Sequence, residues 1–313
     1  CGNDFVVFHV QSDITDNQLS SLSQYLCDRN FGIGADGIIV SVPSTVADFG
    51  MRIFISDGSD GEMCVNGIRC FAKYQFDQNI VSKASQDSGG ISIETTVSVV
   101  EVKVKRDGLG LVTRASTTLP AQSFNPLDCG VMTANDSDNI SLRIEEQAIA
   151  LQLISMGNPH AVHWLAEGHE TPDYELVRIG PKVETDATFQ QKTNFEIAEL
   201  VDRNYIRARV WERGVGETLA CGSGACAVMA SAYSRGLIDD HAVVAMPGGE
   251  LSIEGSGQGP ITLEGLVTKV FAETIESVTY THRTLPTTPY VRCSHAPHCI
   301  KNNSTNQSEP SHR

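Results

Sequence analysis

The feature that most constrains the fold is an internal duplication of the chain. Four segments of the first half recur in the same order in the second half, at offsets of 155, 157, 157 and 159 residues. A period this long excludes a solenoid of short repeats and indicates two homologous domains related by a pseudo-twofold axis. The matching pairs are GNDFVV with GNPHAV, RIFISDGSDGEMC with RVWERGVGETLAC, the tripeptides VNG and GSG after each cysteine, and SGGISIE with PGGELSIE.

Each duplicated half predicts strands and one enclosed helix. Residues 68–78 and 225–235 contain few helix breakers and are predicted as helices, and the second of these is small or apolar on nearly every face. Runs with the β-branched, aromatic or alternating pattern of strands cover residues 52–55, 91–105, 205–211 and 251–269. We therefore predict an α+β fold of two pseudo-symmetric domains, each a β-sheet shell around a central helix.

The repeat also predicts the domain boundaries. We place the first repeat at residues 1–118, completed by about residues 271–281, and the second repeat at residues 119–270. Residues 282–313 are rich in Pro, Ser, Asn and His and show no periodicity, which is typical of a disordered tail.

Composition excludes several classes of function. With 23 Lys and Arg against 38 Asp and Glu, the net charge is −15, and no basic run is present, so we expect no nucleic-acid partner. No run approaches the roughly 20 apolar residues of a membrane span, and the N-terminus has no export signal pattern. The cysteines are odd in number and thinly spread, which indicates reduced thiols and a cytoplasmic protein. They are Cys1, Cys27, Cys64, Cys70, Cys129, Cys221, Cys226, Cys293 and Cys299.

Two of these cysteines occupy equivalent positions in the repeat. Cys64 and Cys221 each precede a predicted helix, where free N–H groups can lower a thiol pKa and hold a carboxylate. If the pseudo-twofold axis brings the halves face to face, the two thiols approach one ligand from opposite sides. One thiolate could then remove a proton from a carbon next to a carboxylate while the other thiol returns one, which inverts the stereocentre.

This chemistry requires no cofactor, and the sequence predicts none. No Gly-x-Gly-x-x-Gly fingerprint follows a strand, no P-loop is present, and no lysine is singled out for pyridoxal phosphate. The spacings Cys64/Cys70 and Cys221/Cys226 do not match those of zinc ligands, so we expect no metal in the site. Cys293, His295, His298 and Cys299 in the tail are a weak metal-binding alternative to a solvated segment.

Structural roles are the alternative for other residues of the same types. Cys27 and Cys129 fit small buried apolar side chains, and Cys70 and Cys226 fit packing positions inside the two helices. Asn3, Asn158 and Asn194 could be ordinary turn formers. Because Asn3 and Asn158 occupy equivalent repeat positions, we favour a shared role in ligand binding.

The chain resembles the diaminopimelate epimerase family, which supplies meso-diaminopimelate for lysine and peptidoglycan-precursor biosynthesis. The resemblance covers residues 2 to about 275, and residues 201–227 contain nearly the entire family signature. The motifs are GNDFVV, FGIGADG, RIF-x-x-DGS-x-x-EMC-x-NGIRCFAKY, MGNPHAV, VDRNYIRARVWERGVGETLACGSGACA and PGGELSIE. The resemblance implies two mixed-sheet domains, each around a helix, and a cofactor-independent isomerase that converts LL-diaminopimelate to meso-diaminopimelate, as a homodimer.

The resemblance also implies roles for individual residues. It makes Cys64 and Cys221 the acid and base, and it places His160 and Glu212 next to the reacting centre. Arg213 would bind the distal carboxylate of the substrate. The other implied substrate-binding residues are Asn3, Asn158 and Asn194 through their side chains, and Val65, Asn66, Gly222 and Ser223 through backbone amides.

The sequence departs from the family pattern at several positions. Ile55 replaces an asparagine expected to hold the distal end of the substrate. Val65 replaces a glycine after the first cysteine, where a β-branched residue resists a positive φ and could crowd the carboxylate. The strand that precedes GNDF in the family is largely missing, which favours an N-terminal truncation over a lipidated Cys1.

These departures keep two alternatives open. One is a racemase or epimerase of the same fold that acts on another amino acid, as Ile55 suggests. The other is a catalytically impaired homologue, which Val65 and the missing strand favour and the retained Cys64 and Cys221 oppose.

Overall fold

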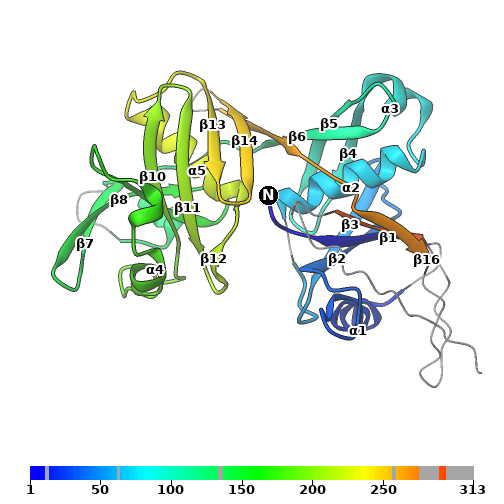
Figure 1. Ribbon diagram of the computed structural model, residues 1–313, viewed down its shortest axis with the longest axis horizontal. Coiled ribbons are helices and arrows are strands. Elements are labelled where there is room, and N and C mark those ends of the chain that lie inside the picture. The colour runs from blue at the N-terminus through cyan, green and yellow to red at the C-terminus, as the bar shows by residue number, and fades with distance from the viewer. Residues whose placement is uncertain (11–13, 62–63, 133–136, 256–258, 275–288, 294–313) are drawn as a thin grey trace, which may run out of the picture.

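The computed structural model describes residues 1–10, 14–61, 64–132, 137–255, 259–274 and 289–293. Figure 1 shows two lobes, and the N-terminus lies between them. The helices are α1 (Asp16–Cys27), α2 (Val65–Asp77), α3 (Lys83–Ser88), α4 (Leu176–Glu184) and α5 (Gly222–Ser234), with 3-10 turns η1 (Pro126–Cys129) and η2 (Thr171–Asp173). The first-lobe strands are β1 (Phe5–His9), β2 (Gly37–Val42), β3 (Phe49–Ile55), β4 (Gly90–Glu94), β5 (Val99–Arg106) and β6 (Val112–Leu119).

The second lobe repeats this order of elements. Its strands are β7 (Asn139–Ile144), β8 (Gln147–Ser155), β9 (Pro159–Trp164), β10 (Asn194–Asp202), β11 (Tyr205–Glu212), β12 (Gly216–Thr218), β13 (His241–Met246), β14 (Gly249–Glu254) and β15 (Ile261–Leu266). β1 is parallel to β2 as β9 is to β10, and β2 is antiparallel to β3 as β10 is to β11. Both lobes therefore contain parallel and antiparallel pairs, as a mixed sheet does, and the predicted fold class is confirmed.

Helices lie on both faces of each sheet because the strands are apolar on both sides. On β1, Phe5 and Val7 belong to the core around α2, whereas Val6 and Phe8 pack with α1. In the second lobe α5 has one core and α4 the other. Helix α5 is buried along almost its whole length, in agreement with its small apolar sequence.

The predicted helices start earlier than their predicted boundaries. Both α2 and α5 begin directly after their cysteines, three residues before the predicted starts at 68 and 225. The predicted strand at 91–105 is a hairpin of β4 and β5, and residues 251–269 contain β14 and β15. The alternating pattern alone does not show where one strand of each pair ends and the next begins.

Two sets of strands connect distant parts of the chain. β6 pairs antiparallel with β15, which joins the sheets of the two lobes. β16 (Phe271–Thr274) and β17 (Pro289–Cys293) form an antiparallel pair, and β17 also pairs with β1. Residues 289–293 thus form a strand where the sequence predicts a tail without regular structure; residues 282–288 and 294–313 lie outside the described residues.

Candidate active site

Cys64 and Cys221 are the N-caps of the two central helices. The Sγ of Cys64 accepts a hydrogen bond from the N–H of Gly67, and the Sγ of Cys221 accepts one from Gly224, each at 3.4 Å. Both sulfurs therefore lie at the positive end of a helix dipole, where an anion is stabilised. The predicted placement of both cysteines at helix entrances is confirmed.

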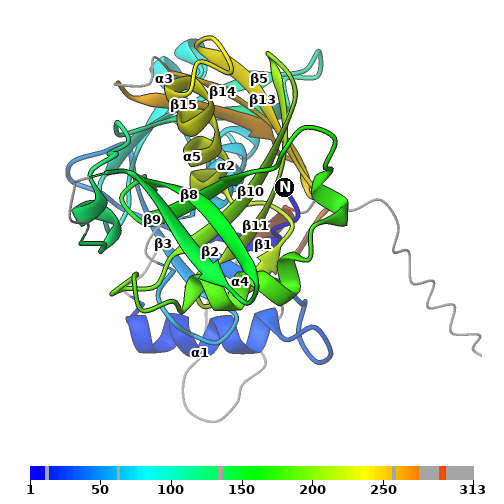
Figure 2. The ribbon, with the colours of Figure 1, turned by 90° about the vertical axis from the view of Figure 1, so that its left-hand side faces the viewer.

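The N-terminal ends of α2 and α5 contact each other. Figure 2 shows the two helices overlapping in a view from the side of the second lobe. A Cβ atom added to Gly222 would lie 2.9 Å from the Cβ of Val65. The side-chain amide of Asn66 also reaches the carbonyl of Ala220 at 3.5 Å. The contact therefore joins the residues next to both cysteines, and Val65 packs in the core of the second lobe.

The expected strain at Val65 is absent. Val65 is the first residue of α2, and its φ is not positive. Its β-branched side chain is 7% exposed and fills the space that the missing side chain of Gly222 leaves. The prediction that this residue resists its backbone conformation is wrong, because the position is helical.

Burial raises the pKa of both thiols, so the expected lowering at a helix entrance is also wrong here. Burial is the largest cause for Cys64, whose pKa rises to about 11, and the nearby Glu212 carboxylate raises it further. The pKa of Cys221 is raised well above its usual value by burial and by Glu212. The N–H of Gly67 or Gly224 lowers the pKa of its thiol, but by less than burial raises it. Both cysteines are thus neutral thiols in the ligand-free protein at neutral pH.

A network of side chains in the first lobe holds the residue that follows Val65. Asn3 donates to Asp36 at 3.1 Å and accepts from Asn66 at 2.7 Å. Asn66 in turn accepts from Arg69 at 2.6 Å. Arg69 is 2% exposed, and within the described part of the chain its Nε has no hydrogen-bond partner. This network brings Asn3 and Asn66 together beside Cys64.

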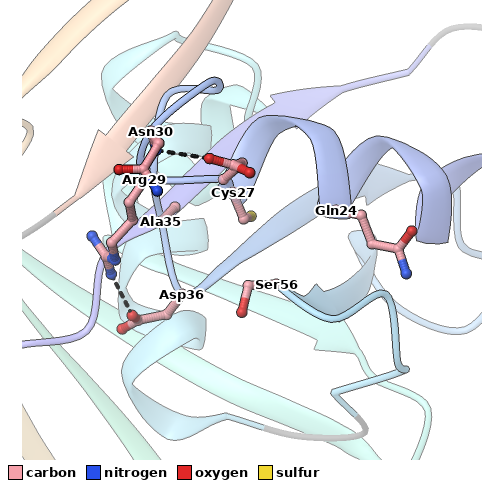
Figure 3. Close-up of a pocket in the computed structure, with 8 residues that line it drawn as sticks. Gln24, Cys27, Arg29, Asn30, Ala35, Asp36 and Ser56 are labelled. Carbon is pink, nitrogen blue, oxygen red and sulfur yellow. Dashed lines mark hydrogen bonds and ion pairs between the residues drawn. The ribbon is translucent and has the colours of Figure 1, made fainter.

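Asp36 also faces a cavity of about 370 Å³ next to α1. Its carboxylate pairs with Arg29 at 2.7 Å (Figure 3). Arg29 also pairs with Asp4 at 2.9 Å. The cavity is lined by Gln24, Cys27, Asp28, Arg29, Asn30, Ala35, Asp36 and Ser56. It shares Asp36 with the network around Asn3, but neither Cys64 nor Cys221 lines it.

The second lobe has a corresponding network beside Cys221. Asn158 donates to the hydroxyl of Ser223 at 3.4 Å, and that hydroxyl lies 3.4 Å from the Sγ of Cys221. His160 lies 3.1 Å from Asn158 and 2.7 Å from Glu196. Asn158, His160, Ser223 and Cys221, all predicted site residues, therefore lie within one hydrogen-bonded group.

Glu212, Asn194 and Arg213 lie at the adjoining ends of β10 and β11. The Glu212 carboxylate accepts from the Thr218 hydroxyl, and its hydrogen bond with Cys221 contributes to its pKa, which burial raises overall. Asn194 donates to the Pro159 carbonyl at 3.0 Å and accepts from the backbone N–H of Arg213 at 2.8 Å. The side-chain amide of Asn194 therefore connects the start of β9 to the backbone of Arg213.

The Arg213 side chain is exposed and donates to the carbonyl of Gln191 at 3.1 Å. Within the described part of the chain it forms no ion pair with a carboxylate. No cluster of three or more His, Cys, Asp or Glu side chains that could hold a metal ion occurs among the described residues. None of the seven cysteines whose side chains are described forms a disulfide.

Sequence reasoning missed three charged residues of these networks: Asp36, Glu196 and Arg69. Glu196 could have been found as a charge within the otherwise apolar run NFEIA, because a buried charge needs a specific partner. Asp36 precedes the apolar run GIIV inside a motif that had no assigned role. Arg69 lies in a predicted helix, and nothing in the local pattern marks it as buried.

Among the helices of the described residues, none is both long and apolar enough to cross a membrane. Solved structures with the same fold include a probable proline racemase from Agrobacterium radiobacter, with a TM-score of 0.59 and 14% identity, covering 85% of this chain and 89% of the other. A hydroxyproline epimerase from Agrobacterium vitis aligns with a TM-score of 0.58 and 14% identity over 82% and 83% of the two chains. These similarities establish the fold alone.

Sequence similarity is much higher to proteins named diaminopimelate epimerase. One from Methanococcus maripaludis is 37% identical over 286 residues, which cover 88% of this chain and 96% of that protein. Another from Pseudomonas entomophila is 37% identical over 273 residues, covering 86% and 94%. The family model described as "Diaminopimelate epimerase" matches residues 1–118 and 152–270. The chain therefore belongs to the diaminopimelate epimerase family.

Proposed function

We propose that this protein interconverts LL- and meso-diaminopimelate, with Cys64 and Cys221 as the acid and base and with no cofactor. The observation that carries the proposal is the contact between two helix N-termini, each capped by a cysteine. Relatives named diaminopimelate epimerase at 37% identity support the choice of substrate. We further propose, from the family resemblance, a cytoplasmic homodimer.

The proposed reaction moves one proton in each direction. When substrate binds, one cysteine loses its proton to the solvent. The resulting thiolate takes the α-proton from one face of the carbon, and the thiol of the other cysteine donates its proton to the opposite face. The backbone amides of Val65, Asn66, Gly222 and Ser223 at the helix entrances would hold the α-carboxylate and stabilise the charge that develops on it. After one turnover the two sulfurs have exchanged their protonation states, which matches a reversible reaction.

The remaining site residues would position the substrate. Asn3 and Asn158 occupy equivalent places beside the two helix entrances, and His160 lies behind Asn158. Arg213 would bind the distal carboxylate, which its exposed side chain can reach without breaking an ion pair. Asn194 would fix the backbone of Arg213. Glu212 would lie next to the reacting centre, because its charge affects the pKa of both thiols.

The test is incubation with LL-diaminopimelate in deuterated water, with NMR detection of α-proton loss and of the meso product. A panel of single amino acids, including proline and hydroxyproline, is run in parallel. Exchange with inversion of diaminopimelate alone is expected. Faster inversion of a monocarboxylic amino acid would favour the alternative of a same-fold racemase, and no exchange on any substrate would favour an impaired homologue.

Arg213→Gln provides a second test of the substrate. Loss of a charge-assisted hydrogen bond to the distal carboxylate should raise the KM for diaminopimelate about 10- to 100-fold, with little change in kcat. Arg203→Gln is the matched control, because Arg203 pairs with Asp239 on the surface. An unchanged KM in Arg213→Gln would contradict the assignment.

A further inference from the structure

Glu196 begins a continuous series of polar contacts that ends at the thiol of Cys221. Its Oε1 lies 2.7 Å from Nδ1 of His160, and Nε2 of His160 lies 3.1 Å from Oδ1 of Asn158. The Asn158 amide donates to Oγ of Ser223 at 3.4 Å, and Oγ lies 3.4 Å from Sγ of Cys221. The residues come from β9, β10 and the first turn of α5, so tertiary structure alone brings them together.

The burial of the Glu196 carboxylate costs free energy of folding and requires specific partners. Glu196 and His160 are both 0% exposed, and Oε2 of Glu196 has no hydrogen-bond partner among the residues that the structure describes. A buried carboxylate that is only partly hydrogen-bonded destabilises a fold unless a neighbouring group compensates its charge. Glu196 also lies against the helix that Cys221 caps, since a Cβ on Gly224 would be 2.7 Å from Oε1.

The direction of the hydrogen bonds follows from the orientation of the Asn158 amide. Its Oδ1 faces Nε2 of His160 and can only accept, so an N–H at Nε2 donates to it. Its NH₂ group faces Ser223 and donates to Oγ. The Ser223 oxygen then acts as acceptor from Asn158, and its own hydrogen is left for the sulfur of Cys221.

We propose that Glu196 is a positioning residue for Cys221, acting through His160, Asn158 and Ser223. The hydrogen bond from Ser223 lowers the pKa of the Cys221 thiol against the opposing effect of burial. Charged groups that face Cys221 from other elements are Glu212 on β11 and Glu196 itself on β10. The role is meaningful for catalysis only if the proposed function holds, but the contact itself can be tested without substrate.

The test measures the alkylation rate of each cysteine with iodoacetamide at fixed pH, by mass spectrometry of the peptides. Glu196→Met has a similar volume but cannot hold His160, so the hydrogen bond from Ser223 to Cys221 should be lost. The charge of Glu196 itself raises the pKa of Cys221, but by less than the Ser223 hydrogen bond lowers it. Cys221 should therefore react more slowly, by up to about tenfold, the value of one hydrogen bond to an anion. Glu196→Gln can still hydrogen-bond Nδ1 and should restore most of the rate. Cys64 is the internal control. Among the described residues, its sulfur accepts a hydrogen bond only from the backbone N–H of Gly67.

Glu199→Gln is the matched control on the same strand. Glu199 pairs with Arg207 at 2.8 Å and is not part of the series, so both cysteines should react as in the unaltered protein. Unchanged reactivity of Cys221 in Glu196→Met, or an equal loss at Cys64 and Cys221, would overturn the proposal. If Glu196→Met does not fold, Ser223→Ala breaks the last contact and must give the same selective loss at Cys221; normal reactivity there would also overturn it.

Activity measurements separate this proposal from the proposed function. If the protein epimerises diaminopimelate, Glu196→Met should lower kcat about tenfold and leave KM nearly unchanged, because Glu196 is 0% exposed and so is not available for contact with a substrate. If the protein has no such activity, the selective change in Cys221 alkylation is still expected. Failure of the alkylation test in an active epimerase would reject Glu196 as a positioning residue without affecting the proposed function.

Discussion

The entrances of α2 and α5 share their backbone geometry but differ in the side chains around them. Each has a cysteine N-cap, a backbone N–H at 3.4 Å from the sulfur, and an asparagine that contacts the second residue after the cysteine. A carboxylate anchors each asparagine, directly through Asp36 in the first lobe and through His160 from Glu196 in the second. The duplication thus preserved the arrangement of the contacts more strictly than the residues that make them.

The polar groups of the site are concentrated in the second lobe. The gapless match of residues 52–64 with 209–221 places Ile55 where the second lobe has Glu212. The equivalent strand pairs Phe5 with Gly37 in the first lobe and His160 with Asn194 in the second. At these two equivalent positions the second lobe has a carboxylate and an imidazole, and the first lobe has apolar side chains. Pseudo-symmetry can supply two equivalent acid/base positions while one lobe alone carries most of the groups that recognise the ligand.

Removal of either thiol should have the largest effect. Cys64→Ala and Cys221→Ala should each lower kcat at least about 10³-fold, because general acid or base catalysis contributes factors of this size. Cys70→Ala and Cys226→Ala are the controls, since these side chains lie in the hydrophobic cores around α2 and α5. Rates are measured by NMR in deuterated water, and circular dichroism checks the fold. Near-normal turnover in either Cys64→Ala or Cys221→Ala would show that the two entrances are not both catalytic.

Val65→Gly tests the contact between the entrances. Loss of the buried side chain should lower the free energy of unfolding by about 2 kcal/mol, and the resulting void at the lobe interface should reduce activity rather than raise it. Urea denaturation gives the free energy. Val177→Gly is the control, because Val177 also lies in the first turn of a helix but is 64% exposed. An increase in kcat with unchanged stability would instead support the prediction that Val65 crowds the substrate carboxylate.

Glu212→Gln tests the electrostatic difference between the thiols. The Glu212 carboxylate raises the pKa of both cysteines, so its removal should lower both values and move both alkylation profiles to lower pH. The shift should be larger at Cys221, for which Glu212 is the second largest cause, than at Cys64. Glu217→Gln, which disrupts an ion pair with Arg209, should shift neither profile. A larger shift at Cys64 would show that Glu212 affects the pKa of the first-lobe thiol more than that of Cys221.

Ile55→Asn should have the smallest effect. Ile55 ends β3 and is 38% exposed, so an amide there would gain about 1 kcal/mol of binding energy with diaminopimelate, roughly fivefold in Kd. Isothermal titration with an inactive Cys221→Ala background measures this. The Ile80→Asn variant, at another 38% exposed isoleucine, is the control. Weaker binding of diaminopimelate would indicate that Ile55 suits a different, more apolar substrate.

The duplicated pattern predicted the architecture and both cysteines because these depend on local sequence that occurs twice. It could not predict Asp36 or Glu196 as anchors, since their contacts depend on the parallel pairing of β1 with β2 and of β9 with β10. The conformation of Val65 was mispredicted because the helix was predicted to begin at residue 68, whereas it begins at Val65. Burial of the thiols, which decides the direction of their pKa shifts, likewise comes from packing between the lobes.

Because Val65 packs against Gly222, each half of the chain fits the other half at this contact but would not fit a copy of itself. A molecule built from two copies of the first half would bring two valines together at the axis, where the present structure leaves no room even for one added Cβ. Two copies of the second half would bring two glycines together and leave a hole. An ancestral pair of identical subunits could therefore not have used this contact as it stands, and gene fusion would have allowed the two sides to diverge. Separately expressed halves should accordingly prefer each other to themselves.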